Sequence, residues 1–123
     1  MYSVLGWTNV TIAALMLLPF VLVKFIKNKD GALKKIQKVL LKMHRPLSGL
    51  LLVSAIVHGY LALGTFALHT GTLLVISLVV SGIFASIFIM KKKKIFFNLH
   101  RMMASIFIVL LFVHLLFPWI LTK

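Results

Sequence analysis

Four histidines lie inside otherwise apolar segments of the chain, in two pairs of identical spacing. His44 precedes His58 by fourteen residues, and His100 precedes His114 by the same interval. On a helix this interval corresponds to a rise of about 21 Å and a rotation that returns to within roughly 40° of the starting face. Each pair therefore points in one direction at two depths. Because ionisable side chains are rare inside membrane segments, these histidines predict a functional site.

Two helices that carry such pairs could hold two haems between them, one at each depth. Bis-histidine ligation fills both axial positions of a haem iron and favours electron transfer. A zinc or copper ion shared within one pair is excluded, because a rise of about 21 Å far exceeds metal–ligand distances of about 2 Å. The chain has no cysteine, which also excludes iron–sulfur clusters and thiolate-ligated haem. We therefore expect two haems b, with neutral histidines whose other ring nitrogens donate to nearby acceptors.

An internal repeat at an offset of 56 residues places the histidines on equivalent helices. Five residues of the first half, Lys35, Lys38, His44, Arg45 and His58, recur as Lys91, Lys94, His100, Arg101 and His114. The repeat indicates two helical hairpins in tandem, related by an axis along the membrane normal. The two histidine-bearing helices then run in the same direction. We expect His44 to face His100 at one level and His58 to face His114 at the other.

The composition indicates a membrane protein. Of the 123 residues, 62% are hydrophobic, and the mean hydropathy of +1.12 is far above that of soluble domains. An apolar run of about 20 residues crosses the hydrocarbon core as a helix. We expect one all-α domain over residues 1–123, a transmembrane four-helix bundle with two haems stacked between its second and fourth helices. The expected helices are residues 3–26, 46–63, 72–90 and 97–121, with a basic amphipathic segment over 32–43.

Charge and aromatic residues predict the orientation of this bundle. The net charge is +13, with Asp30 as the one acidic side chain, and all basic residues except Arg101 and Lys123 lie between Lys24 and Lys94. Basic residues in short loops beside spans indicate the cytoplasmic side rather than nucleic-acid binding. Trp and Tyr concentrate at membrane interfaces. Here they lie at the helix ends opposite to the lysine-rich ones: Tyr2, Trp7, Tyr60 and Trp119. We expect an integral protein of the cell membrane whose termini are both extracytoplasmic and whose basic loops are cytoplasmic, with the first span retained as a helix.

Residues around the expected ligands suit a flat macrocycle. Small side chains let a helix backbone approach a bulky group, and Ser48 and Ala104 follow the first histidine of each pair at helical spacing, with Gly49 and Gly59 nearby. Phe107 lies halfway between His100 and His114, where it either fills the gap between two haems or packs as ordinary core or against lipid.

Other polar residues leave two interpretations open. Arg45 and Arg101 each follow a ligand directly, and they either pair with the propionates of the inner haem or serve only as positive-inside charges. His69, in the outer connection, is either an electron exit or metal ligand or simply solvated. Asn9 and Thr11 either hydrogen-bond the outer haem or pack between helices.

This pattern resembles the membrane core of the ferric reductase-like transmembrane family, which includes metalloreductases and NADPH oxidases, and more distantly cytochrome b of quinol-oxidising complexes. The resemblance spans Lys42 to Trp119 and is carried by His44, Arg45, His58, His100, Arg101 and His114. In these proteins two helices each supply two histidines that ligate two haems b. The resemblance implies transmembrane electron transfer. Family members usually have about six helices, often fused to a cytoplasmic domain that binds FAD and a nicotinamide cofactor, whereas these 123 residues hold four expected helices and no such domain.

We therefore expect a di-haem cytochrome b, either a transmembrane oxidoreductase or an electron-transfer subunit, embedded in membrane lipid. Its expected donor is a cytoplasmic flavin reductase or quinol, and its expected acceptor is extracytoplasmic, such as ferric iron or oxygen. Quinol is the weaker donor, because Asp30 is the only carboxylate side chain to take its protons. Two alternatives remain: a haem-free basic membrane protein that serves as a pore or assembly subunit, and a carrier that moves haem.

Overall fold

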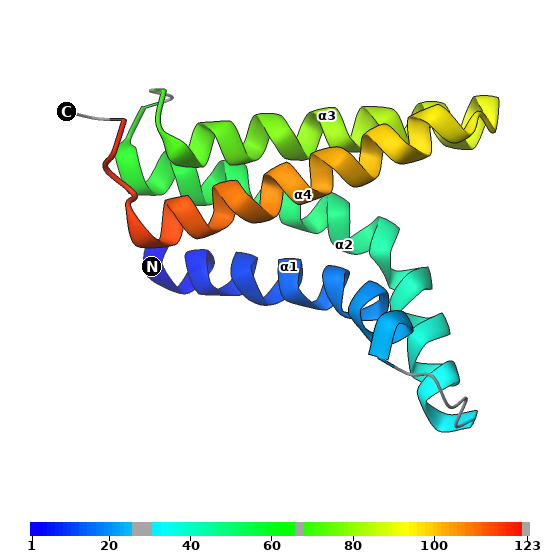
Figure 1. Ribbon diagram of the computed structural model, residues 1–123. Coiled ribbons are helices and arrows are strands. Elements are labelled where there is room, and N and C mark those ends of the chain that lie inside the picture. The colour runs from blue at the N-terminus through cyan, green and yellow to red at the C-terminus, as the bar shows by residue number, and fades with distance from the viewer. Residues whose placement is uncertain (26–30, 66–67, 122–123) are drawn as a thin grey trace. The chain divides into compact units, whose positions relative to one another are not determined.

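Long apolar runs set the architecture, because a chain in lipid must satisfy its own backbone hydrogen bonds. The computed structural model describes residues 1–25, 31–65 and 68–121, and within these ranges it contains four α-helices (Figure 1). They are α1 (Tyr2–Phe25), α2 (Gly31–Leu63), α3 (Thr70–Lys91) and α4 (Lys94–Leu116). The expected all-α class is confirmed.

All four helices are long and apolar enough to cross a bilayer. Many large hydrophobic side chains are exposed, among them Val4, Val53, Val109 and Phe112. In water such a surface would drive aggregation, whereas in a bilayer these side chains would contact lipid tails. Length, composition and exposed surface together indicate an integral membrane protein.

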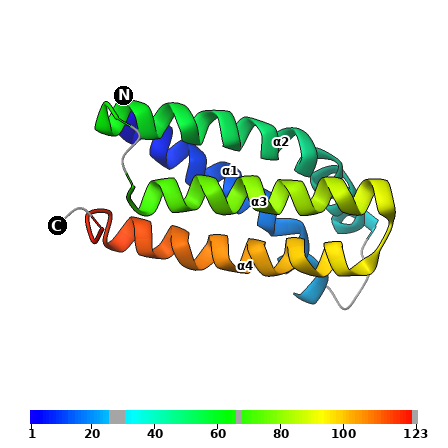
Figure 2. The ribbon, with the colours of Figure 1, turned by 90° about the horizontal axis from the view of Figure 1, so that it is seen from above.

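The chain divides into two units, Met1–His58 and Gly59–Lys123. The first unit holds α1 and most of α2, and buried apolar residues of α1, Ile12, Ala13 and Met16, lie along one side of that helix. In the second unit, α3 and α4 lie side by side and antiparallel (Figure 2). Each unit is therefore built around a helical hairpin, as the repeat predicted.

The first boundary of α2 differs from the sequence prediction. A surface segment over 32–43 and a separate span from Pro46 were expected, but a single helix runs from Gly31 to Leu63 with Pro46 inside it. Proline removes one backbone hydrogen bond and usually bends a helix, and Figure 1 shows α2 changing direction along its length. One lost bond is not enough to end a helix whose flanking turns are regular. Asp30, expected in a turn, and Ile26, the expected end of the first helix, lie outside the described residues.

A two-residue connection, Lys92 and Lys93, joins α3 to α4. Lys92 adopts the left-handed conformation with φ 53°, and its N–H donates to the carbonyl of Phe88 over 2.8 Å. This is the αL type of helix ending. The α4 helix then begins at Lys94, three residues before the expected start at Phe97, and the Phe88 and Phe97 rings pack with centroids 5.3 Å apart.

The α4 helix is shorter at its far end than predicted. It ends at Leu116 rather than Leu121, and a turn follows in which the N–H of Ile120 donates to the carbonyl of Phe117 over 3.2 Å. Pro118 explains the difference, because proline offers no N–H to continue the ladder and disfavours helical geometry in the residue before it. The turn brings the carbonyl of Pro118 back toward α3.

The other end of α3 begins at Thr70, two residues before the expected Thr72. His69 caps it in an extended conformation, and its carbonyl accepts the N–H of Leu73 over 3.2 Å. Gly64 ends α2 with φ +66°, a conformation that glycine adopts without steric cost.

Candidate functional site

The buried side of α3 carries hydroxyl groups in an otherwise apolar helix. Its buried residues recur at intervals that place them on a single stripe: Thr70, Leu74, Ser77 and Ser81. The hydroxyl of Ser77 donates to the carbonyl of Leu74 within the same helix. Those of Thr70 and Ser81 instead contact the two histidines of α4. The stripe therefore holds both candidate ligands of the second unit.

His100 is anchored at Ser81. Its Nδ1 lies 2.9 Å from both the backbone carbonyl oxygen and the hydroxyl of Ser81. A carbonyl oxygen only accepts hydrogen bonds, so Nδ1 is the nitrogen that carries the hydrogen. In the neutral imidazole the lone pair then resides on Nε2.

His114 is held in the same way by Thr70. Its Nδ1 lies 2.7 Å from Oγ1 of Thr70, and that hydroxyl lies 3.1 Å from the carbonyl oxygen of Pro118. The single hydroxyl hydrogen of Thr70 is donated to Pro118, because a carbonyl cannot donate. The hydroxyl must therefore accept from Nδ1–H of His114, and Nε2 of the neutral ring carries the lone pair. Thr70 is only 2% exposed, so this chain of bonds lies away from solvent.

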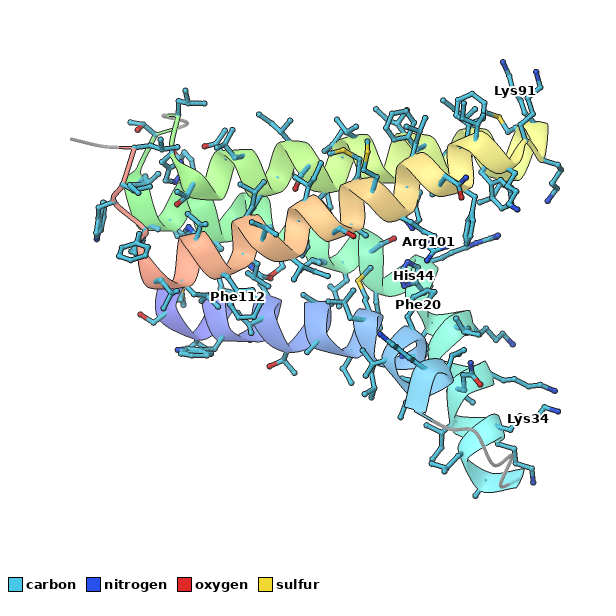
Figure 3. The ribbon with its side chains drawn as sticks, viewed as in Figure 1. Phe20, Lys34, His44, Lys91, Arg101 and Phe112 are labelled. Atoms are coloured by element: carbon cyan, nitrogen blue, oxygen red, sulfur yellow. The ribbon has the colours of Figure 1, made fainter. Side chains whose placement is uncertain are left out.

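The first unit positions its histidines by close packing. A Cβ atom placed on Gly6 of α1 would lie 3.1 Å from Cε1 of His58, so the imidazole of α2 rests directly on the α1 backbone. His44 lies near the other end of the hairpin, where its ring meets the edge of Phe20 with centroids 5.7 Å apart and planes at 79° (Figure 3). The Nδ1 atom of His44 is shielded from solvent. All four predicted ligands are half-buried.

His69 lies beside His114 rather than alone in a loop. Its Nδ1 is 2.7 Å from Oγ1 of Thr72, and its Nε2 would lie 3.4 Å from a Cβ on Gly71. Cε1 of His114 would lie 3.4 Å from the same Cβ position. Two imidazoles therefore flank one glycine at the start of α3.

The residues predicted around the ligands have more varied surroundings. Arg45 and Arg101 are exposed, and the guanidinium of Arg101 lies 6.0 Å from the centre of the Phe97 ring. The hydroxyl of Ser48 donates to the carbonyl of Arg45 over 2.6 Å. Ala104 and Phe107 are half-buried on α4. A propionate role for the arginines, and a haem-facing role for Ser48, Ala104 and Phe107, stay predictions.

The two candidate residues on α1, Asn9 and Thr11, differ in their hydrogen bonds. The hydroxyl of Thr11 donates to the carbonyl of Trp7 in its own helix over 3.0 Å. The side-chain oxygen of Asn9 is buried and has no hydrogen-bond partner among the described residues. Gly49 and Gly59 were predicted to allow a close approach, but a Cβ placed on either would meet nothing within 4 Å in the described chain. Gly6 and Gly71, which the sequence reasoning did not select, are the glycines that meet histidines.

Some of these contacting residues could have been selected from the sequence. Thr70 and Ser81 are eleven residues apart in an apolar span, an interval that places two polar side chains on one helical face. Gly6 interrupts an apolar helix where alanine would be more stable. What the sequence lacks is the register between neighbouring helices, which decides which hydroxyl or glycine meets which imidazole.

The histidines fit the axial positions of a haem iron better than a site in which three or more side chains bind one metal ion. Within residues 1–25, 31–65 and 68–121, no group of three or more His, Asp or Glu side chains could hold a metal ion. A haem iron requires only two axial imidazoles, and its ligands normally present Nε2 while Nδ1–H is bonded to an acceptor. His100 and His114 have this arrangement. No protein-family model, no curated protein and no solved structure matches this chain.

Proposed function

We propose that the chain is a di-haem cytochrome b that carries electrons across the membrane. The observation that supports this most strongly is the pair of buried acceptors on α3, the carbonyl of Ser81 and the hydroxyl of Thr70, which orient Nδ1–H of His100 and His114. Such outer-sphere acceptors fix the tautomer and ring orientation of a ligating histidine and raise its basicity.

The proposed ligand pairs follow from the repeat. His44 and His100 would hold the inner haem b, and His58 and His114 the outer one. When bound, bis-histidine haem b supplies reversible one-electron reduction. The chain contributes neutral imidazoles of fixed orientation, small residues beside them at Ser48 and Ala104, and Phe107 between the two levels. Arg45 and Arg101 would pair with the inner propionates through bidentate hydrogen bonds.

The proposed electron donor is a cytoplasmic flavoprotein, with quinol as the second choice, and the proposed acceptor is an extracytoplasmic species such as ferric iron or oxygen. Lys34, Lys35, Lys38 and Lys42 on α2, and Lys91 to Lys94 at the α3–α4 connection, are exposed. Clusters of exposed lysines such as these accelerate encounter with an acidic partner. The rate of reduction by such a reductase should therefore fall as ionic strength rises. A reduction rate that does not change with ionic strength would show that the lysines do not steer the reductase.

The proposal also fixes an orientation in the cell membrane. The lysine-rich connections would face the cytoplasm and both termini the outside, since basic loops are retained on the cytoplasmic side. A phosphatase that is active only outside the cytoplasm, fused after Lys123, should then be active. A fluorescent reporter that folds only in the cytoplasm should be dark at the same position. The reverse pattern would contradict the orientation.

Transport of electrons is tested in vesicles that contain the purified chain and trapped ferricyanide. Dithionite added outside should bleach the trapped ferricyanide in vesicles loaded with haem, and the rate should exceed that of vesicles without protein. The matched control is the double variant His44→Ala/His100→Ala, which removes the inner ligand pair and should return the rate to background.

The two alternative functions give different outcomes. Purified protein that contains no haem b, despite haem supply during expression, would contradict the proposal and favour a haem-free pore or assembly subunit. Protein that contains haem but never bleaches ferricyanide, and that exchanges its haem readily with apomyoglobin, would contradict it in favour of a haem carrier.

A further inference from the structure

His58 lies so close to α1 that a side chain at position 6 would make an unusually short contact with its ring. A Cβ on Gly6 would be 3.1 Å from Cε1 of His58, 3.6 Å from Nε2 and 3.7 Å from Nδ1. Carbon atoms in contact prefer a separation of about 3.5–4.0 Å. The Cε1 corner of the imidazole therefore points at the glycine, with its two nitrogens on either side.

Gly6 is the only glycine in α1. Glycine inside a helix is less stable than alanine by about 1 kcal/mol. In an apolar helix with no turn at this position, the close approach of the His58 ring is the feature that requires it. Three glycines inside α2 and α3, Gly49, Gly59 and Gly82, would have nothing within 4 Å of an added Cβ among the described residues, so they show no such requirement.

The second hairpin has a looser version of this contact. Cε1 of His114 points at Gly71 near the start of α3, at 3.4 Å from its would-be Cβ. Gly6 and Gly71 are 65 residues apart, whereas His58 and His114 are 56 apart. The glycines therefore do not follow from the sequence repeat that relates the histidines, and of these two glycines Gly6 alone is closer to its histidine than an ordinary contact.

We propose that Gly6 is a positioning residue for His58, which sets the ring orientation needed for ligation at the outer level. This inference rests on the proposed function, in which His58 is an outer ligand. A methyl group at position 6 would push the ring away by a few tenths of an ångström. Axial ligation depends on the direction of the nitrogen lone pair, so such a displacement would weaken the outer site and leave the inner one intact.

The test compares three glycine-to-alanine variants of the full chain. Gly6→Ala should lower the affinity of the outer site for haem about tenfold, the scale of the loss when a supporting residue around a metal ligand is removed. Gly71→Ala adds a methyl group at ordinary contact distance from His114 and should retain both haems. Gly82→Ala, in open surroundings on α3, should also retain both. Haem per chain and the low-spin electron paramagnetic resonance signals of the two haems are the measurements.

A second measurement needs no haem. In the haem-free chain, diethyl pyrocarbonate should modify His58 faster in Gly6→Ala than in the wild type, with His114 unchanged, as mass spectrometry of the peptides would show. Helix content by circular dichroism should not fall, because alanine favours helix.

The outcomes separate this inference from the proposed function. If wild-type protein binds two haems and Gly6→Ala behaves like Gly82→Ala in both measurements, the positioning role is wrong. Equal loss of both haems with a lower melting temperature would also contradict it, since Gly6 would then matter for folding alone. Wild-type protein without haem would overturn the proposed function, and the modification rate of His58 would then decide the role of Gly6.

Discussion

Thr70 and His114, 44 residues apart in the chain, meet at 2.7 Å between Oγ1 and Nδ1. The same hydroxyl donates to the carbonyl of Pro118, so one buried threonine connects the start of α3, the end of α4 and the turn that follows. This hydroxyl gives His114 a fixed tautomer and the turn a fixed position.

Replacing Thr70 with valine should affect His114 more than any other predicted ligand. Valine has nearly the same shape but cannot accept Nδ1–H or donate to Pro118, and leaving a buried group unsatisfied costs about 1–3 kcal/mol. We expect outer-haem affinity to fall about 10- to 100-fold, as for other outer-sphere partners of metal ligands. Haem titration of the purified variant measures this.

Thr72→Val is the matched control, because it removes a threonine hydroxyl two residues away whose bond is to His69. It should leave the outer haem in place. If Thr70→Val and Thr72→Val bind haem equally well, the hydrogen bond to His114 does not support ligation.

Ser81→Ala should have a much smaller effect than Thr70→Val. The carbonyl of Ser81 still accepts Nδ1–H of His100 at 2.9 Å when the hydroxyl is removed. We expect a loss of about 1 kcal/mol or less in the free energy of unfolding and an unchanged inner haem content. Ser86→Ala, at an exposed hydroxyl bonded to Gly82 of its own helix, serves as the control. Selective loss of the inner haem in Ser81→Ala would show that the hydroxyl, not the carbonyl, is the essential acceptor.

Phe20→Leu should make the ring orientation of His44 less fixed. The substitution retains an apolar side chain but removes a ring that packs edge to face with the imidazole, with centroids 5.7 Å apart, a contact type that contributes about 0.5–1.5 kcal/mol. A shift in the midpoint potential of the inner haem, with the outer one unchanged, is expected in a redox titration. Phe112→Leu, at an exposed position of α4, should shift neither potential. Identical titrations of both variants and the wild type would contradict a role for Phe20.

Arg45→Gln combined with Arg101→Gln should reduce the inner haem content. Both side chains are exposed, so each pair with a propionate would contribute about 1 kcal/mol or less, and the double variant should bind the inner haem several-fold more weakly. Lys34→Gln removes an exposed charge elsewhere on α2 and should have no effect. Inner-haem occupancy that is unchanged in the double variant would leave the arginines as orientation signals only.

Much of the fold was predictable because apolar length is a strong signal. The four spans are helices, and the hairpin of α3 and α4 follows from their short basic connection. Boundaries at proline were not predicted correctly. Pro46 lies within α2, whereas Pro118 lies beyond the end of α4. Whether a helix survives the loss of one hydrogen bond depends on how its neighbouring turns pack, which local sequence does not encode.

The candidate site was predictable at the level of the histidines but not of their supports. The spacing of His100 and His114 gave their common face, and the need for acceptors at Nδ1 followed from the chemistry of ligating imidazoles. That Ser81 and Thr70 are those acceptors depends on the register of α3 against α4, which arises from packing. His69 lies between α2 and α3, where the sequence placed it, but its closeness to His114 across Gly71 appears only in three dimensions.

The pyridine haemochrome assay tests the central claim most directly, because it counts haem b per chain. The wild-type protein should contain two haems. Each single variant, His44→Ala, His58→Ala, His100→Ala or His114→Ala, should contain about one, since each removes one axial ligand from one bis-histidine site, whereas His69→Ala should retain two. Wild-type protein without haem, or four histidine variants with the same haem content as the wild type, would contradict the account.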